Sequence, residues 1–433
     1  MNGTLPTPIL QVVLNNSPRI FISWRYLGSN SLWALVKLFD NSGLIQTASS
    51  DPGSIFYDFV PNQPLNNPPY SIRLAATDGT NTGPDSVAIP VILYKPIIRE
   101  LVYDTVNVGV TLKPPSPPQP AGTYYVITVF KDGVGENSEP FLGLQGSAPL
   151  DHAPATANCS ASVVANQDIP QGQFSCTTTG PSSVQVGIIT QPATIVRVQF
   201  ISESRVEVDA TGPTSVGPPI TGHRWVYGNE VCSSTQLKDL AATGVASNDF
   251  DGDSGVLELT AAIDPTQPTC LIAAGTSTSP ETVSVGPYST PLQIITEAPS
   301  FVSLMSTTAG ALVANWTTVP PPPNDQIEYR LDLSRNGLLI DQQTTALLNF
   351  QFAVLFEAGG IYTLIVRAMT SDGRVIGPAS APAPGPFISN SPTVLYDSLG
   401  RLVSMSITGY RDLTYTLDSF GNITNAKVNN NNA

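Results

Sequence analysis

Residues 311–333 read ALVANWTTVPPPPNDQIEYRLDL, and residues 19–39 read RIFISWRYLGSNSLWALVKLF. In both stretches apolar and polar side chains alternate, a tryptophan ends the first alternating run, and a second run follows after a break. A period of two places one face of a strand in a core and the other in water. A tryptophan at a strand end can fill the space between two sheets with one large side chain. The pattern predicts strand pairs belonging to two-layer β-sandwiches.

The later parts of the same two copies also correspond. Residues 70–76 read YSIRLAA and residues 362–368 read YTLIVRA, and each run leads through an Asp-Gly turn to a Gly-Pro-x-Ser sequence, at 83–86 and 377–380. Glycine supplies the positive φ that tight turns need. A weak internal repeat of roughly 95–100 residues is too long for a solenoid and is typical of tandem sandwiches.

Two less complete copies lie between these. The second has VNVGVTL at 106–112 and YYVITVF at 124–130, but Phe174-Ser-Cys176 stands where the tyrosine strand is expected. In the third copy, four stretches follow one another in the same order as the motifs of the first and last copies: 205–209 (RVEVD), 225–227 (WVY), 270–274 (CLIAA) and 286–289 (GPYS). Proline runs at 114–120 and 320–323 take the same place in the second and fourth copies. They are expected to end a strand and stiffen the next loop, because proline cannot donate to a ladder; the alternative is a proline-rich peptide ligand.

These residues resemble the fibronectin type III family. Its pattern is a tryptophan strand followed by prolines, a Tyr-x-Leu/Val-x-Leu/Val strand, a Tyr-x-Val-x-Val-x-Ala strand and an exit through Gly-Pro-x-Ser. Other immunoglobulin-like domains share the alternation and some of the aromatic residues. The resemblance implies an all-β chain of four tandem fibronectin-III/Ig-like sandwiches followed by a C-terminal β-hairpin segment. The expected segments are 1–96, 97–193, 194–297, 298–387 and 388–433, with cysteines in the two divergent middle sandwiches.

The C-terminal residues have a different texture. YDSLGRL at 396–402 is echoed by LDSFGNI at 417–423, with leucine in place of the tyrosine. The shared core resembles the YD repeat of RHS-type bacterial surface and toxin proteins. That resemblance implies turn glycines and, after each, the start of an inward-facing strand: Gly400 with Leu402, and Gly421 with Ile423. Since two such repeats are poorly stable alone, we expect them to pack on the fourth sandwich or to pair edge to edge with another subunit.

The composition narrows the function classes. The chain has 433 residues, of which 12% are charged, with 40 prolines and 34 glycines. Proline and glycine disfavour long helices. The net charge of −14, with 19 basic residues spread thinly, argues against nucleic acid and anionic membrane surfaces as partners. No apolar run approaches the ~18 residues of a membrane span, and the N-terminal residues 1–6 lack the features of a signal peptide. The chain is therefore expected to be a mature or trimmed form, or to use another export route.

The four cysteines fall into two pairs, Cys159 with Cys176 and Cys232 with Cys270, each within one expected sandwich. Two interpretations stay open: two disulfides within sandwiches, or buried free thiols. Disulfides would indicate an oxidising compartment. The wide spacing and the two histidines disfavour a metal site.

An acidic stretch at 248–255, NDFDGDSG, holds the strongest candidate for a cation site. Asp249, Asp251 and Asp253 alternate and are followed by glycine, as in the first half of a calcium-binding loop. The twelfth position is threonine rather than glutamate, so a solvated acidic turn competes with a weak Ca²⁺ site. The GDSG sequence at 252–255 is similar to a serine-protease nucleophile loop, but His223 is too close to Ser254 along the chain to complete a triad.

No phosphate-binding glycine loop, dinucleotide motif or Cys/His catalytic pair is present in the sequence. Exposed aromatic side chains could stack on sugars; the candidates, each better explained as core or interface, are Trp33, Trp225, Tyr26 and Tyr410. We therefore expect a non-enzymatic extracellular or cell-surface protein, a structural or adhesive spacer or filament subunit that binds protein partners or itself. The alternatives are a ligand-binding module, for glycans among others, of a larger RHS-like toxin or injection apparatus, and, least favoured, a polysaccharide-acting enzyme. The short proline-bearing links at 94–96, 191–193 and 297–299 favour a semi-rigid rod.

Overall fold

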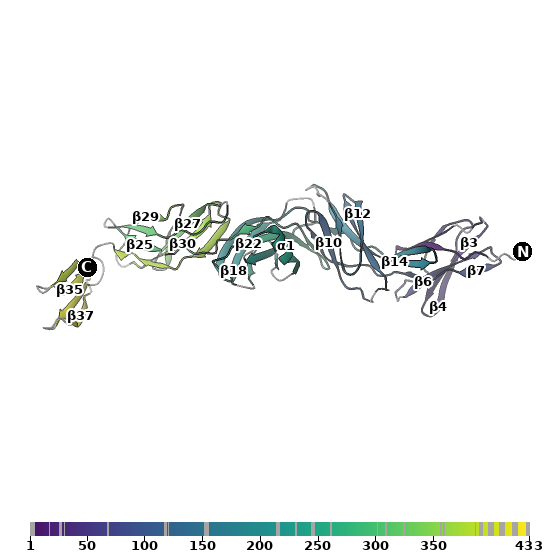
Figure 1. Cartoon of the computed structure of the whole chain (residues 1–433), viewed down its shortest axis with the longest axis horizontal. Helices are drawn as coiled ribbons and strands as arrows, with labels where there is room; N and C mark the ends of the chain where they lie inside the picture. Colours follow the sequence, from purple (N-terminus) through teal and green to yellow (C-terminus); the bar gives the residue numbers. More distant parts are fainter. Residues whose placement is uncertain are drawn as a thin grey trace.

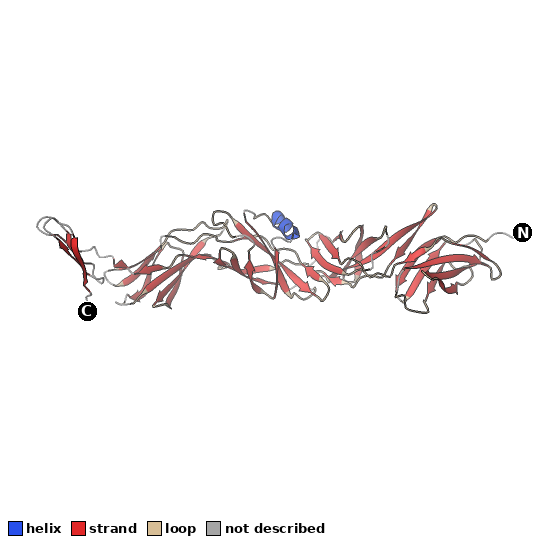
Figure 2. Cartoon of the chain, turned by 90° about the horizontal axis from the view of Figure 1, so that it is seen from below, coloured by secondary structure: helices blue, strands red, loops and turns tan. Residues whose placement is uncertain are grey.

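The computed structural model is built almost entirely of β-strands arranged in sequence along an elongated molecule (Figures 1 and 2). One helix, α1, occurs among the described residues. The described residues are 5–16, 18–25, 28–29, 31–66, 69–116, 119, 121–150, 156–213, 217–229, 232–243, 247–259, 262–300, 302–307, 310–323, 325–355, 357, 360–385, 387–388, 393–396, 402–406, 412–417 and 423–429.

The strands form four consecutive sets with a common order, which we call units 1 to 4. Unit 1 holds β1 (Leu10–Asn16), β2 (Arg19–Trp24), β3 (Trp33–Asp40), β4 (Gly43–Ser49), β5 (Phe56–Phe59), β6 (Tyr70–Thr77), β7 (Thr82–Asp85) and β8 (Ile89–Val91). Unit 2 holds β9 (Ile98–Tyr103), β10 (Asn107–Leu112), β11 (Tyr124–Lys131), β12 (Val134–Phe141), β13 (Gln145–Pro149), β14 (Cys159–Gln171), β15 (Phe174–Thr179) and β16 (Val186–Gly187).

Units 3 and 4 continue the series, and five further strands follow. Unit 3 holds β17 (Thr194–Ser202), β18 (Arg205–Thr211), β19 (Gly222–Asn229), α1 (Ser234–Thr243), β20 (Ser247–Asp251), β21 (Ser254–Glu258), β22 (Thr269–Thr278), β23 (Val283–Val285) and β24 (Leu292–Gln293). Unit 4 holds β25 (Ser303–Ser306), β26 (Ala311–Asn315), β27 (Ile327–Arg335), β28 (Leu338–Thr345), β29 (Asn349–Leu355), β30 (Tyr362–Thr370), β31 (Val375–Ala379) and β32 (Ala383–Gly385). The last strands are β33 (Phe387–Ile388), β34 (Thr393–Tyr396), β35 (Leu402–Ser406), β36 (Asp412–Leu417) and β37 (Ile423–Asn429).

Each unit is a sandwich of a three-stranded and a four-stranded layer. In unit 1 the layers have the orders β5-β2-β1 and β4-β3-β6-β7, and the other units repeat both orders. Two antiparallel layers with this order are the immunoglobulin-like arrangement that fibronectin type III domains share. The expected all-β, fibronectin-III/Ig-like fold class is therefore confirmed. The division into independently folding domains at the expected limits stays a prediction.

The sheets do not stop at the limits of the units. A strand from each following unit pairs in parallel with the first strand of the unit before it: β15 with β1, β23 with β9, and β31 with β17. Three eight-stranded sheets result, each with strands from two successive units. The layers of neighbouring units are thus one hydrogen-bonded surface.

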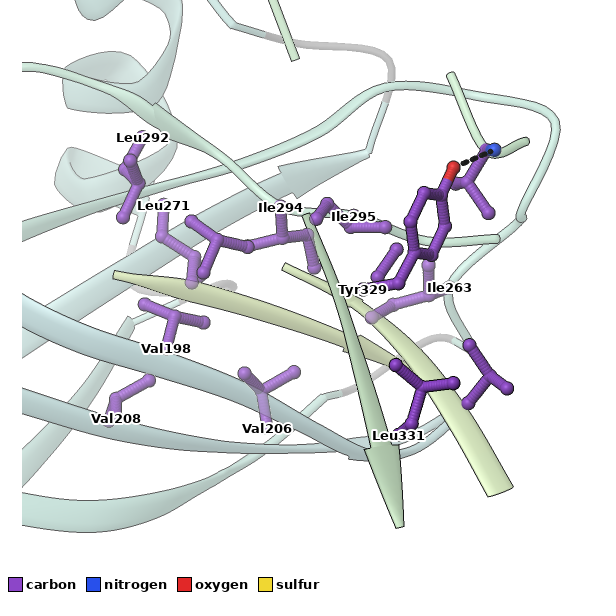
Figure 3. Packing of buried hydrophobic residues seen from close by; sticks show 14 of the residues in the cluster. Val198, Val206, Val208, Ile263, Leu271, Leu292, Ile294, Ile295, Tyr329 and Leu331 are labelled. Carbon is purple, nitrogen blue, oxygen red and sulfur yellow. Dashed lines mark hydrogen bonds between the residues drawn. The ribbon is translucent and has the colours of Figure 1, made fainter. Parts of the chain in front are cut away.

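Large side chains fill the sandwiches as the alternation predicts. Trp24 and Trp316 end or follow the second strand of units 1 and 4 and are 0% and 5% exposed. Units 3 and 4 share one apolar cluster, in which Val198 and Leu331 come from different units (Figure 3). Its aromatic Tyr329 accepts a hydrogen bond at its hydroxyl from the amide of Val319 at 3.2 Å (Figure 3).

The turns also follow the sequence. Asp132 and Gly133 have φ of 51° and 82°, and Asn336 and Gly337 have φ of 53° and 83°. Positive φ at both central residues is the hairpin geometry that Asp-Gly and Asn-Gly favour. β10 ends at Leu112, just before the first proline run.

One strand assignment from the sequence was wrong. Phe174-Ser-Cys176 lies in β15, the last strand of the four-stranded layer, whereas the strand expected there is β14. The inward side chains of β14 include Ala161, Val163 and Ala165, all 0% exposed. Because these side chains are small, β14 lacks the tyrosine pattern by which the equivalent strand was recognised in units 1 and 4.

A serine fixes the same backbone irregularity in all four units. It ends a Gly-Pro-x-Ser sequence, which recurs at 83–86, 180–183, 286–289 and 377–380. Each serine amide donates to a carbonyl of the neighbouring strand, and each serine hydroxyl accepts the amide of that same neighbour. The pairs are Ser86 with Leu74, Ser183 with Val163, Ser289 with Ala273 and Ser380 with Val366, with hydroxyl distances of 3.0, 2.9, 3.0 and 3.0 Å. The hydroxyl thus replaces a backbone carbonyl where the strand leaves the ladder.

The C-terminal strands form a separate antiparallel sheet in the order β34-β35-β36-β37. Leu402 and Ile423 begin β35 and β37, as expected for strands that follow the two turns. Gly400 and Gly421 lie outside the described residues. The YD-repeat resemblance itself stays a prediction.

We expect Ser380→Ala to lower the free energy of unfolding by about 1–3 kcal/mol, because the buried amide of Val366 loses its acceptor. Chemical denaturation measures the change. Ser371→Ala, at an exposed serine of the same unit, is the matched control and should stay within about 0.5 kcal/mol. Equal effects of the two substitutions would refute the role of the hydroxyl.

Candidate functional site

The cysteine pair in unit 3 is confirmed as a disulfide. Cys232 and Cys270 are bonded, with a Cα–Cα distance of 5.2 Å and a sequence separation of 38. The bond joins the segment before α1 to the start of β22. Leu237 of α1 packs in a small apolar cluster with Cys270 and Ile272, so the disulfide and the helix together cover this face of unit 3.

Of the two interpretations left open for Cys159 and Cys176, the buried free thiols hold, and the disulfide predicted between them is not formed. Cys176 stands opposite Ile169 in the β14–β15 ladder, ten residues along β14 from Cys159. At ~3.3 Å per residue that is roughly 30 Å, whereas bonded cysteines have Cα atoms within about 7 Å. Cys159 belongs to the core of unit 2, but Cys176 belongs to the core of unit 1. Burial raises the pKa of the Cys176 thiol to about 12, with a further contribution from Asp168.

The acidic stretch is organised by arginine rather than as an open cation site. Both carboxylate oxygens of Asp249 accept hydrogen bonds from Arg224, at 2.7 and 2.9 Å. Asp253 lies beyond the turn at Gly252, with its carboxylate 3.9 Å from the Nδ1 of His223. No group of three or more His, Cys, Asp and Glu side chains is placed to hold a metal ion in the described part of the chain. Calcium binding by Asp249, Asp251 and Asp253 stays a prediction.

Two of the four aromatic candidates for sugar stacking lie among the described residues. Trp225 is 1% exposed and belongs to the core of unit 3. Trp33 is half-buried at the start of β3. Tyr26 and Tyr410 lie outside the described residues.

A groove of about 610 Å³ lies between units 3 and 4. Its walls include Pro192, Pro322 and the disulfide cysteines, with Asp325 and Arg374 as its charged side chains. Arg374 is already ion-paired with Asp372. The groove is therefore a concave surface whose charged side chains do not form a catalytic acid–base pair. No helix among the described residues is long and apolar enough to cross a membrane.

The features that do recur with defined geometry are the three junctions between units, and we take them as the candidate functional site. At the first junction, Val12 to Leu14 pair with Thr177 to Thr179. The hydroxyl of Thr178 donates to the carbonyl of Pro90 at 2.8 Å, and the side-chain amide of Gln171 donates to the carbonyl of Leu10 at 2.9 Å.

The second junction repeats this arrangement and adds a charge network. The hydroxyl of Ser284, equivalent to Thr178, donates to the carbonyl of Gly187 at 2.8 Å. Arg224 of unit 3 bonds Glu100 of unit 2 at 2.5 Å as well as Asp249. Burial opposes the charge of Arg224, but the hydrogen bonds to Asp249 and Glu100 outweigh it and raise the pKa of the guanidinium. The cation is therefore fixed between two units.

The third junction is the most apolar. The amide of Val198 donates to the carbonyl of Arg374 at 2.7 Å. Val375 takes the position of Thr178 and Ser284, and it is 1% exposed. Units 3 and 4 are thereby joined by both backbone pairing and a common core.

A glycine makes each junction possible. A Cβ on Gly180, Gly286 or Gly377, the first residue of each Gly-Pro-x-Ser, would lie 2.5–2.7 Å from the Cγ2 of an isoleucine in the preceding link. These isoleucines are Ile92, Ile189 and Ile295. Contacts under 3.0 Å force a shift, so only glycine lets the link and the strand pack this closely. Sequence reasoning noted three of the four Gly-Pro-x-Ser sequences but missed the one at 180–183. It also missed the contact between each of these glycines and an isoleucine of the preceding link.

The chain was compared with protein-family models, curated proteins and solved structures. No family model and no curated protein matches the chain. Among solved structures, it is similar to the FN1-FN3 domains of chicken CNTN1, with 13% sequence identity over 68% of this chain and 100% of that chain, and a TM-score of 0.23. A TM-score this low does not establish a shared overall arrangement.

We expect alkylation with iodoacetamide to label two cysteines per chain when the protein is unfolded without reductant, and none when it is folded, because Cys159 and Cys176 are buried thiols. Intact mass measurement counts the labels. Absence of labelling in the unfolded chain would mean a second disulfide and would contradict this arrangement.

We expect Glu100→Ala to lower the free energy of unfolding by about 1–2 kcal/mol, because it removes a charged hydrogen bond from the half-buried Arg224. Glu258→Ala is the control, since its pair with Arg205 is exposed on both sides and should contribute less than about 1 kcal/mol. Denaturation of both variants at low salt tests the difference; a smaller effect at Glu100 than at Glu258 would contradict it.

Proposed function

We propose that the chain is a non-enzymatic structural rod of the extracellular space or a cell surface, which holds what is attached at its two ends at a fixed separation and orientation. The observation that carries the proposal is the pairing of a strand from each unit with the first strand of the unit before it. Flexible linkers between domains leave relative motion as the default. Backbone pairing removes that freedom, because bending a junction must break ladder hydrogen bonds.

The extracellular part of the proposal draws on the disulfide and the surface. A structural disulfide such as Cys232–Cys270 forms and persists in oxidising compartments. The low charged fraction of 12% and the acidic balance of −14 suit a soluble spacer with little affinity for anionic surfaces.

The non-enzymatic part draws on where the polar groups are used. Several charged side chains bind one another at ladders and junctions: Arg197 with Asp209, Arg224 with Glu100, and Arg367 with Asp332. Catalytic groups must instead converge on a cavity with perturbed acidity. Chemistry of that kind has no supporting geometry in the described residues.

We expect small-angle scattering of the purified chain to give one elongated shape whose maximum dimension does not change with salt. Gly286→Ala forces Ile189 and the link apart, so it should lower the free energy of unfolding by about 1–3 kcal/mol and broaden the distribution of shapes. Gly135→Ala is the control, because a Cβ there meets only ordinary contact at 3.7 Å. A broad distribution of bent shapes for the unsubstituted chain would overturn the rod proposal.

A further inference from the structure

The three junctions define one rule for how units bind. The donor is the strand that leads into Gly-Pro-x-Ser, and the acceptor is the outer edge of the first strand of the preceding unit, in parallel. Strand addition of this kind also joins separate proteins, where main-chain hydrogen bonds provide affinity.

Two edges of the same kind lack such a partner among the described residues. The donor strand of unit 1, β7, pairs there with β6 alone. The acceptor strand of unit 4, β25, has on its outer side the two-residue β33, through Met305 and Ser306. β7 and β25 lie towards opposite ends of the elongated molecule (Figure 1).

We propose that these two edges bind each other in separate copies of the chain: β7 of one copy adds in parallel to β25 of the next, in place of β33, and builds a head-to-tail filament. The inference rests on the proposed rod function, because only a stiff chain would hold the contacts at its two ends in a fixed relative orientation. A heterologous contact between opposite ends does not close, so it generates an open filament.

The register follows from the internal junctions. The residue two positions before the Gly-Pro pairs with a buried residue of the acceptor strand: Thr178 with Val13, Ser284 with Leu101, and Val375 with Val198. In unit 1 that donor position is Asn81. In unit 4 the acceptor position is Leu304, which is 0% exposed and pairs with Ala314 as Val13 pairs with Ile22.

The donor side is exposed and already ordered. Asn81 and Thr82 are exposed, and the carboxylate of Asp78 accepts the amides of Thr80 and Asn81 at 2.8 and 2.7 Å. A hairpin held in this way loses less conformational entropy on binding. The side-chain amide of Asn81 takes the place of the hydroxyls of Thr178 and Ser284. One of its two hydrogens is donated to Asp78 at 3.3 Å, and the other can be donated to a carbonyl.

The acceptor side offers the matching carbonyl. Thr178 donates to Pro90, the middle residue of β8, which pairs with Ser71 of β6. The equivalent residue of unit 4 is Pro384 of β32, which pairs with Thr363 of β30. β33 supplies two backbone pairs to β25, whereas the internal donors supply two or three pairs together with side-chain hydrogen bonds. A second copy therefore offers β25 at least as many backbone pairs as β33 does, and it displaces β33 once the chain is concentrated enough to offset the entropy cost of association.

The test measures self-association of the full chain. Sedimentation velocity from roughly 1 to 100 μM gives the size of the assemblies, and negative-stain microscopy shows their shape. We expect single-file filaments or short oligomers that grow with concentration. Asn81→Asp places a carboxylate against the carbonyl of Pro384 and should weaken association at least about tenfold. Asn41→Asp makes the same charge change at an exposed turn of unit 1 and should leave association unchanged.

If the unsubstituted chain does not associate, either β33 blocks the edge of β25 or the proposed contact does not exist. A variant on the acceptor side distinguishes these two cases. Phe387→Pro removes the amide of β33 that faces β25 and should strengthen association. The proposal is overturned if neither the unsubstituted chain nor Phe387→Pro associates at ~100 μM, or if Asn81→Asp and Asn41→Asp associate equally. Scattering from dilute monomers reports the rod separately, so a stiff monomer that does not associate refutes the filament and leaves the proposed function standing.

Discussion

An exposed strand edge must be paired or protected, because its unpaired amides and carbonyls bind any available strand. In this chain the protection comes from the next unit. The outer edges of β1, β9 and β17 are covered by β15, β23 and β31. The same hydrogen bonds therefore cover the exposed strand edge of each sandwich and set the arrangement of successive units. The continuous eight-stranded sheets depend on this one pairing.

The local chemistry of each unit is arranged around that pairing. The glycine of Gly-Pro-x-Ser makes room for an isoleucine of the link, and the serine closes the ladder where the strand turns away. The junctions differ in what they add: hydroxyl bonds at Thr178 and Ser284, a bridging cation at Arg224, and a shared apolar cluster at Val375. An apolar junction depends on burial, whereas the Arg224 bridge is weakened as charges are screened by salt.

Much of the fold could be predicted from the sequence because alternation, turn residues and tryptophans are local signals. Trp24, Trp316 and the Asn-Gly turn at 336–337 lie where these signals place them. The β14 strand was misjudged, since its core positions carry alanine and valine rather than aromatic residues. The junctions could not be predicted: Arg224 and Glu100 are 124 residues apart in the chain, and nothing local marks a strand that crosses to another unit. The same crossing placed Cys176 in the core of unit 1 and separated it from Cys159.

The most direct measurement is hydrogen exchange at the amide of Val198, which donates across the third junction to Arg374 at 2.7 Å. If the sheets are continuous, this amide exchanges as slowly as amides inside β18, because both open only when the units unfold. If the units are separate beads, it exchanges as fast as an edge-strand amide while β18 stays protected. That second result would contradict the continuous sheets on which this account depends.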